Sequence, residues 1–532
     1  MLSVREPAPG GRTPVVALLL AAVLLGGVIA WAYAPILDNG FVWDDGANLG
    51  IARAEWDRGP AGLAWAFREP FYGHYQPLTW VSYQIDAWLT GATPRGVHAT
   101  QLILHLANTA LVGRLAWVLA ACPALGAVRA LAQPRRRTAW AVLAAALFAL
   151  HPIRVESVAW ATERRDLLST FFVLGALVLH VRASPVDTSP SPVRGRVALL
   201  HALAALSRAQ VTLPFVLLLA DLWPLRRLET PADRPGGLLR LVSEKGVSLA
   251  IAAASAAAAL WAQASQGALT AAAEHGLPAR LVQAGYGLAF YPASWLFGRT
   301  WLPLYERPVP FVATAPGHLL PALAAVGVLV GLWLLRRRIP PVAAACGAYL
   351  LLVLPVLGIA QAGVQLVADR YAYLATVPLV LLAAGAGVVL WSRLPGRAVR
   401  APVALGLAAL LAANTLATRR QTRVWQSDET LWRHVLAHSG SCLADNNLGY
   451  LLLSRGENGP ALFHLVRSLE RVPSYGRPWQ GLVALLEAPR PADAPPAGWV
   501  VRTLERAAAT QPASALARRS VALARSAAGR SR

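Results

Sequence analysis

The stretch PVVALLLAAVLLGGVIAWAY, from Pro14 to Tyr33, decides the fold class of this chain. It contains no charged residue, and a helix of about 20 apolar residues is long enough to cross the hydrocarbon core of a bilayer. Similar apolar blocks recur along the 532 residues, of which 56% are hydrophobic and 14% are charged. This composition excludes a soluble globular enzyme, a disordered chain and a disulfide scaffold, and it indicates an integral membrane protein.

Basic residues exceed acidic residues, 49 against 27, which gives a net charge of +22. On a soluble protein this surplus would suggest a nucleic-acid partner. Here the arginines cluster between apolar blocks, as in 135–137 and 336–338, which is the pattern of cytoplasmic loops under the positive-inside rule. We therefore predict no nucleic-acid partner. The cysteines Cys122, Cys346 and Cys442 are far apart and lack metal-ligand spacing, so a disulfide or zinc framework is not expected.

The alternation of apolar blocks with arginine-rich loops predicts about eleven transmembrane helices, with the amino end in the cytoplasm and the carboxyl-terminal region on the other side. The segment 283–297 is amphipathic and leads into aromatic residues, so we expect a helix that lies in the membrane interface. The predicted spans are 14–33, 97–121, 138–150, 166–181, 197–206, 211–223, 246–264, 318–335, 341–357, 374–391 and 401–416.

The predicted fold is therefore all-α, with a polytopic transmembrane helix bundle over residues 1–417 and a periplasmic helical domain over residues 418–532. One stretch of the second domain fits a tetratricopeptide repeat of about 34 residues, opened by Asn-Leu-Gly at 447–449. Gly456, Ala461, Ser468 and Pro473 follow where that repeat has small helix contacts and a closing proline. The alternative is an arbitrary helical hairpin. A repeat would offer a concave surface to a peptide.

Two adjacent carboxylates, Asp44 and Asp45, follow the first span within a few residues of bilayer depth. Like charges this close raise each other's pKa, and an acid beside a membrane indicates function because it is expensive to place there. Since adjacent side chains point in different directions, one acid could activate an incoming hydroxyl while the other binds a metal or orients a partner. The structural alternative is a helix N-cap, for which Asp is a favoured residue.

The segment 72–80, which contains His74 and Tyr75, is rich in aromatic residues. Such a segment beside a membrane forms either an interfacial belt or a wall on which a sugar stacks. His98 and His105 lie seven residues apart on one helix face, and we expect them to be hydrogen-bonded core groups rather than metal ligands.

Arginines on the non-cytoplasmic side oppose the positive-inside rule, and Arg154, Arg164 and Arg165 are of this kind. A lipid phosphate would supply the anionic partner that they need. The alternative is pairing within the segment, whose acids are Glu156, Glu163 and Asp166.

The segment 368–373 places Asp369 and Arg370 at another outer mouth of the bundle. The two either form a buried pair, or Arg370 faces a phosphate. All four of these segments map to the same side of the membrane. We therefore predict an outward-facing cavity, lined by carboxylates, arginines and aromatic residues and open to the lipid.

Taken in this order, the motifs resemble those of the protein O-mannosyltransferase-like membrane glycosyltransferases with tetratricopeptide repeats, which have the glycosyltransferase-C fold. The residues that carry the resemblance are Trp43-Asp44-Asp45, 75–79, 98–108, His151-Pro152 with Glu156, Ala159-Trp160, and 369–371 with Tyr373. The resemblance implies transfer of a sugar from a polyprenyl-phosphate sugar to an acceptor on the non-cytoplasmic face of the membrane. We predict that this membrane is a bacterial inner membrane.

The resemblance also implies roles for individual residues. Asp44 or Asp45 would deprotonate the acceptor hydroxyl, which attacks the anomeric carbon with inversion. Arginines would stabilise the departing phosphate, and the candidates are Arg154, Arg164, Arg165 and Arg370. Further substrate-binding candidates are His74, Tyr75, Glu156, Asp166, Arg208 and Asp369.

The chain departs from the family pattern at two places. The family often has Ser-Lys-Glu where this chain reads Ser207-Arg208-Ala209, so the basic residue is kept and the carboxylate is lost. A loop motif closer to Gly-Arg-Ala-Asp in the family reads Glu-Arg-Arg-Asp at 163–166, so that Arg164 and Asp166 match. If the lost carboxylate takes part in catalysis, this chain uses another donor or is inactive.

Two hypotheses of different classes follow. The first is a membrane glycosyltransferase whose partners are a polyprenyl-phosphate-linked sugar, membrane lipid, and an acceptor protein or glycan. The second is a non-catalytic membrane scaffold that binds a periplasmic partner through its repeat domain. A transporter is disfavoured because few charges lie within the spans. The motifs specify no cofactor, and a divalent metal at one acid of the pair is left open.

Overall fold

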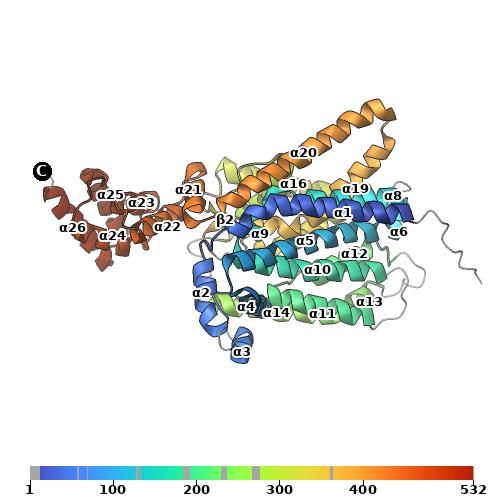
Figure 1. Cartoon of the computed structure of the whole chain (residues 1–532), viewed down its shortest axis with the longest axis horizontal. Coiled ribbons are helices and arrows are strands. Elements are labelled where there is room, and N and C mark those ends of the chain that lie inside the picture. The colour runs from blue at the N-terminus through green and yellow to red at the C-terminus, as the bar shows by residue number, and fades with distance from the viewer. Residues whose placement is uncertain are drawn as a thin grey trace, which may run out of the picture.

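The computed structural model is helical almost throughout (Figure 1). It describes residues 12–56, 59–68, 70–126, 131, 133–183, 192–228, 237–265, 276–359 and 363–530. In these ranges the strands β1 (Tyr305–Glu306) and β2 (Gln365–Val367) form one short antiparallel sheet. The predicted all-α class is therefore confirmed.

The helices up to residue 424 form the bundle and the segments that connect its helices. Their bounds are α1 Arg12–Tyr33, α2 Asp45–Trp56, α3 Pro60–Arg68, α4 Pro77–Thr90, α5 Pro94–Leu119, α6 Pro123–Gly126, α8 Pro134–Ala149, α9 Val155–Ala159, α10 Arg164–Ala183, α11 Pro192–Ser207, α12 Leu213–Leu222, α13 Gly237–Ser243, α14 Gly246–Ser265, α15 Leu277–Phe297, α16 Pro316–Leu335, α17 Pro340–Val353, α18 Ala372–Ala375, α19 Val377–Arg393 and α20 Gly396–Val424.

Six helices of the described ranges are long and apolar enough to cross a membrane: α1, α5, α10, α14, α16 and α20. Two bent pairs raise this number to eight if each pair is one span. One pair joins α8 to the segment Pro152–Ala159 with a bend of 62°, and the other joins Asp369–Ala375 to α19 with a bend of 60°. Helices α12 and α17 are apolar but shorter. The polytopic bundle is confirmed, whereas the count of eleven spans is not.

The helix α15 begins six residues earlier than the predicted interfacial segment and packs along the apolar helix α16. Gly285 makes this approach close, because a Cβ atom there would lie 2.7 Å from the Cβ atom of Ala322. Whether α15 lies in the membrane interface stays a prediction.

The bundle has two distinct ends. The arginines of 135–137 and 393–400 lie at one end, which we call the basic end. The loops before α5, between α8 and α10, and before α19 meet at the other end, which we call the site end (Figure 1). The helices that follow α20 extend from the site end (Figure 1).

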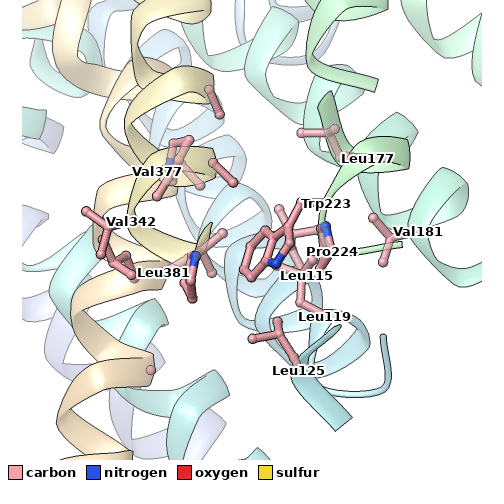
Figure 2. A pocket seen from close by; sticks show the side chains of 18 of the residues that line it. Leu115, Leu119, Leu125, Leu177, Val181, Trp223, Pro224, Val342, Val377 and Leu381 are labelled. Carbon is pink, nitrogen blue, oxygen red and sulfur yellow. The ribbon is translucent and has the colours of Figure 1, made fainter. Parts of the chain in front are cut away.

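An apolar groove of about 470 Å³ lies between α5, α10, α12, α17 and α19. In Figure 2, Val342 and Leu381 face Leu177 and Val181 across this groove, with the ring of Trp223 between them. We call it the first groove. It runs from Leu374 near the site end toward Arg393 at the basic end.

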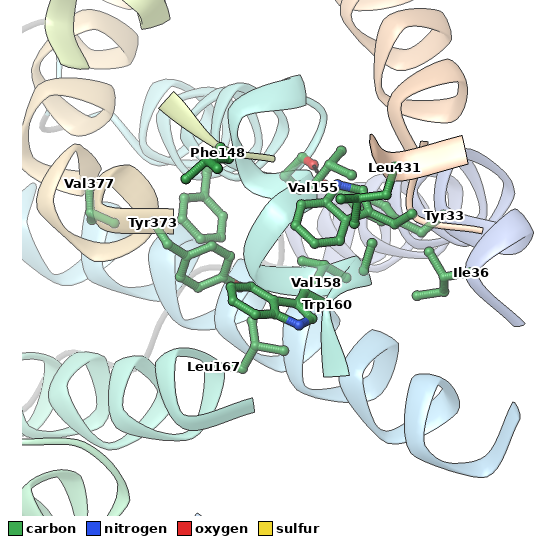
Figure 3. Packing of buried hydrophobic residues seen from close by; sticks show 14 of the residues in the cluster. Tyr33, Ile36, Phe148, Val155, Val158, Trp160, Leu167, Tyr373, Val377 and Leu431 are labelled. Atoms are coloured by element: carbon green, nitrogen blue, oxygen red, sulfur yellow. Dashed lines mark hydrogen bonds between the residues drawn. The ribbon is translucent and has the colours of Figure 1, made fainter. Parts of the chain in front are cut away.

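The bundle interior beside the site end is aromatic with a few paired polar groups. Phe148 and Tyr373 meet edge to face, with ring centroids 5.3 Å apart, and Trp160 and Leu167 lie next to them (Figure 3). The Tyr373 hydroxyl also pairs with Nδ1 of His105 at 2.8 Å. The predicted core role of His105 is therefore confirmed, and this packing fixes the helix ends on which the candidate site stands.

Six helices follow α20: α21 Asp428–His438, α22 Cys442–Ser454, α23 Asn458–Arg471, α24 Pro478–Glu487, α25 Ala497–Ala509 and α26 Ala515–Arg530. The predicted hairpin is α22 and α23, and a Cβ atom on Gly449 would lie 2.7 Å from Leu465 Cδ2. Its identity as a tetratricopeptide repeat, and the division of the chain at residue 417, stay predictions. The helix α20 continues through that position to Val424.

Candidate active site

Four tryptophans join the loop after α1 to the site end, and we call them the aromatic stack. Trp43 stacks on Trp160 at 4.7 Å and meets Trp432 edge to face at 5.1 Å, and Trp160 stacks on Trp425 at 5.6 Å. The backbone of Trp43 has a φ of 56°, which is strained for a residue with a bulky side chain. Its N–H donates to Oδ1 of Asp428 at 2.7 Å, so the first helix after α20 helps to hold this conformation.

Asp45 is fully buried and holds its own loop in place. Its Oδ1 accepts from the Thr162 backbone N–H at 2.8 Å and from the Thr162 hydroxyl at 2.6 Å, and its Oδ2 accepts from the Val42 N–H at 3.1 Å. Burial raises the pKa of this carboxyl to about 7, and these hydrogen bonds oppose the rise. Asp45 therefore connects the loop after α1 to the loop before α10.

Asp44 differs from its neighbour because its carboxylate is partly exposed. In the part of the chain that the structure describes, this carboxylate makes no hydrogen bond or salt bridge. Burial raises its pKa, while the positive charges of Arg165 and Arg370 lower it and the negative charge of Glu163 raises it. Asp44 is thus the acid of the pair that is free to accept a proton.

Six charged side chains beside Asp44 form what we call the charged cluster: Glu156, Glu163, Arg165, Asp166, Arg208 and Arg370. Glu163 lies at its centre, 2.5 Å from Nη2 of Arg165 and 3.4 Å from Nε of Arg370. Arg370 also pairs with Glu156 through both its guanidinium and its backbone N–H. Among the described residues, the predicted pairing within the segment is found for Arg165 with Glu163. Glu156 and Asp166 pair instead with Arg370 and Arg208, which belong to other segments.

Arg208 is the most exposed arginine of the charged cluster, with 29% of its side chain accessible, and it pairs with Asp166. Asp166, Arg208 and Arg370 line a cavity of about 60 Å³, together with Tyr371. Ala209 lines the same cavity, so the carboxylate expected from the family pattern would have stood there. We call this space the polar cavity. It shares Leu352 and Leu374 with the first groove, so the two are contiguous.

Arg154 is fully buried and does not face the polar cavity. Its nitrogens donate to the carbonyl oxygens of Phe148, Ala372 and Tyr373 at 2.6–3.2 Å and to the Thr376 hydroxyl at 2.7 Å. Its guanidinium also lies over the Phe148 ring, 4.6 Å from the centroid. These bonds join the corner after α8 to the start of α19, so Arg154 has a structural role in place of the predicted contact with phosphate.

Arg164 is likewise enclosed, and all three of its nitrogens have partners. Its Nη1 pairs with Asp86 at 2.5 Å, its Nη2 donates to the Val97 carbonyl at 2.7 Å, and its Nε donates to Gln101 at 3.3 Å. The predicted phosphate contact of Arg164 is therefore replaced by a connection between α4, α5 and α10. Sequence reasoning missed Asp86 because an isolated acid in an otherwise apolar helix gives no motif.

His74, Tyr75 and Asp369 were predicted as substrate contacts, and the structure separates them. His74 lies within electrostatic range of Arg165 and Glu163, and burial lowers the pKa of its imidazole. Tyr75 points elsewhere: its hydroxyl donates to the Phe67 carbonyl at 3.1 Å. Asp369 accepts from the Tyr305 hydroxyl at 3.0 Å and does not pair with Arg370.

Thr162, Asp428 and Trp432 are site residues that sequence reasoning did not identify. Thr162 follows the Ala-Trp motif, but its role depends on Asp45, 117 positions earlier. Asp428 and Trp432 belong to a helix that only the fold brings to Trp43. Among the residues that the structure describes, no three His, Cys, Asp or Glu side chains are grouped so as to hold a metal ion.

Sequence comparison with known proteins tests the predicted resemblance to the protein O-mannosyltransferases. The chain is 28% identical to human protein O-mannosyl-transferase TMTC4 over 177 residues, which are 31% of this chain and 23% of that protein. It is 27% identical to protein O-mannosyl-transferase F38B6.6 of Caenorhabditis elegans over 40% of this chain and 29% of that protein. The chain resembles the protein O-mannosyltransferases. The predicted resemblance is confirmed over these regions.

A third relative, protein O-mannosyl-transferase Tmtc2 of Drosophila melanogaster, is 32% identical over 28% of this chain and 15% of that protein. The alignments thus span less than a third of the length of these protein O-mannosyltransferases. No protein-family model matches the chain. The crystal structure of ArnT from Cupriavidus metallidurans bound to undecaprenyl phosphate aligns with 98% of this chain and 79% of that chain, at 13% identity and a TM-score of 0.37.

Proposed function

We propose that this chain is a membrane glycosyltransferase that moves a sugar from a polyprenyl-phosphate donor to an acceptor hydroxyl. Protein Ser or Thr is the acceptor class, because the relatives are named protein O-mannosyl-transferases. The observation that carries the proposal is Asp44: an acid without a hydrogen-bond partner among the described residues, within electrostatic range of Arg165 and Arg370. A carboxylate in this position has no structural task and is available for proton transfer.

In the proposed reaction, Asp44 removes the proton from the acceptor hydroxyl as the hydroxyl oxygen attacks the anomeric carbon. The bond between that carbon and the phosphate oxygen breaks, and the polyprenyl phosphate leaves with the electron pair of this bond. The configuration at the anomeric carbon is inverted in the product. Asp44 is then protonated and returns its proton to water. Burial raises the pKa of Asp44, which makes it a stronger base than an exposed aspartate.

The polar cavity and the first groove supply a place for the donor. Arg208, partly exposed at the cavity, would bind the phosphate, with Arg370 as the second cation. The polyprenyl chain would continue past Leu374 into the first groove, whose lining is almost entirely apolar. An amphiphilic donor needs such a continuous polar and apolar site, and the shared residues Leu352 and Leu374 join its two parts.

The proposal includes an orientation. The basic end would face the cytoplasm of a bacterial inner membrane, since arginine clusters are retained on that side. The site end and the helices after α20 would then lie in the periplasm. Arg477, between α23 and α24, lowers the pKa of Asp44 through its charge, so an acceptor bound to these helices would lie near the base.

The test uses the full chain purified in detergent micelles with a radiolabelled polyprenyl-phosphate mannose and a Ser/Thr-rich peptide. We expect label on the peptide, and the Asp44→Asn variant should lose on the order of 100-fold or more in kcat while its thermal unfolding is unchanged. Transfer that persists in Asp44→Asn would contradict the role of this acid. Peptide binding without transfer by the native chain, with any hexose donor, would favour the non-catalytic scaffold.

A further inference from the structure

A second groove lies against other residues of α8 and α19 than those that line the first groove, and the proposed reaction does not use it. It has a volume of about 1080 Å³ and is lined by α8, α19, α20 and the end of α15. On α8 the lining runs from Arg135 and Arg136 in the first turn to His151 just beyond the last turn. It therefore extends from the basic end almost to the site end.

One wall of the second groove is α20, much of which nothing in the described chain covers. Only 11% of its most apolar 18-residue stretch is buried. Figure 1 shows the beginning of α20 standing apart from the other helices. Large apolar side chains of α20 are exposed, including Leu405 at 71% and Leu410 at 51%. The groove is consequently open to lipid along this helix.

The basic end of the second groove is lined by Arg135, Arg136 and Arg400. None of the three forms a salt bridge with a residue that the structure describes, and no carboxylate lines the groove. Arg400 donates to the Leu394 carbonyl at 3.2 Å, which holds its side chain at the groove. Arg137, next in sequence, instead donates to the Trp117 carbonyl of α5. Three uncompensated cations at one mouth favour an anionic ligand.

The middle of the groove is apolar. On α8, the lining from Ala139 to Leu147 contains no polar residue and extends about 12 Å at 1.5 Å per residue. One leaflet contributes roughly half of the hydrocarbon core of about 30 Å. An acyl chain of the leaflet at the basic end fits this stretch when its headgroup lies beside Arg136 and Arg400.

We propose that the second groove is a binding site for an anionic glycerophospholipid of the leaflet at the basic end. The phosphate lies among Arg135, Arg136 and Arg400, and one acyl chain lies between α8 and α20. The charge complementarity of the mouth selects an anionic over a zwitterionic headgroup. The lipid fills the space between α20 and the bundle and so supports a helix that is continuous with the site end.

The experiment measures lipid retention by native mass spectrometry of the full chain, with phosphatidylglycerol and phosphatidylcholine as probes. Phosphatidylglycerol should bind more tightly. The variant Arg135→Gln/Arg136→Gln/Arg400→Gln should weaken phosphatidylglycerol binding on the order of 100-fold and leave phosphatidylcholine almost unchanged. The matched control is Arg336→Gln/Arg337→Gln/Arg338→Gln, which removes the same charge from three exposed residues that do not line the groove.

A second variant, Ala408→Trp, fills the groove from α20 and keeps the arginines. It should also reduce phosphatidylglycerol binding. Equal losses in the two arginine variants, or equal binding of the two phospholipids by the native chain, would overturn the site. Displacement of phosphatidylglycerol by stoichiometric polyprenyl phosphate in the native chain would also overturn it, because the groove would then belong to the donor.

Discussion

The indole ring of Trp43 stacks on that of Trp160, with centroids 4.7 Å apart and planes 10° from parallel. Since Trp43 directly precedes Asp44 and Asp45, this contact helps to set the orientation of their two side chains. Asp45 turns to the hydroxyl of Thr162, whereas Asp44 remains without a hydrogen-bond partner among the described side chains. Two adjacent acids thus acquire separate tasks, and each can be tested alone.

Asp45 should make the free energy of unfolding depend on pH. Burial raises its pKa from 3.8 to about 7 in the folded chain, so the folded form keeps a proton that the unfolded form releases above 3.8. The stability from this group is therefore complete below pH 3.8 and is lost as pH rises through about 7. Thermal unfolding in detergent across this range should show the decline in the native chain and a smaller slope in Asp45→Asn.

The variant Asp45→Asn should also be less stable than the native chain at every pH, by about 1–3 kcal/mol. The reason is that the amide N–H groups of the asparagine would face N–H or O–H donors of Val42 or Thr162. An unchanged slope in Asp45→Asn would mean that another group titrates.

Arg165→Gln should move the acidic limb of the pH profile of kcat/KM to higher pH. Asp44 must be deprotonated to act as the proposed base, and the charge of Arg165 lowers its pKa. Removing that charge, and freeing the negative charge of Glu163, raises the pKa of Asp44 further. Initial rates of sugar transfer between pH 4 and pH 8 would measure the shift of this limb to higher pH.

Arg95→Gln is the matched control for this shift, since Arg95 forms an exposed ion pair with Asp38 and carries the same charge. Its pH profile should equal that of the native chain. A limb that stays in place in Arg165→Gln would exclude Asp44 as the titrating base.

The sequence was sufficient to find Asp44, Asp45 and the acids that pair with Arg165 and Arg370, because charged residues beside apolar spans are conspicuous. It could not assign Arg154, three of whose four acceptors are backbone carbonyls, one of them 219 positions away. Every residue has a backbone carbonyl, so the sequence does not show which of them accepts a hydrogen bond. The count of eleven spans is not confirmed for a related reason: hydropathy registers apolar length, and it gives no sign of the bend of 62° after α8.

Asp428→Ala should slow catalysis without touching the reacting groups. Asp428 accepts the Trp43 N–H at 2.7 Å and so positions the loop that carries Asp44. We expect about a tenfold loss in kcat with KM for the donor unchanged, and a stability loss of about 1–2 kcal/mol. Asp428→Asn keeps an acceptor oxygen and should restore most of the rate. Equal rates in Asp428→Ala and the native chain would contradict this positioning role.

Arg154→Gln should lower the stability of the chain, whereas Arg208→Gln should weaken donor binding, although both variants remove one arginine near the site end. Arg154 is fully buried and satisfies three carbonyl oxygens, so its loss leaves buried acceptors unpaired and should cost about 3–5 kcal/mol of stability. Arg208 is 29% exposed, so Arg208→Gln should fold and instead raise KM for the polyprenyl-phosphate donor on the order of tenfold. Thermal unfolding and donor titrations on both variants separate the two effects. If Arg208→Gln bound donor normally while Arg154→Gln folded and lost donor binding, the donor phosphate would belong at the buried corner and the polar cavity would lose its assigned role.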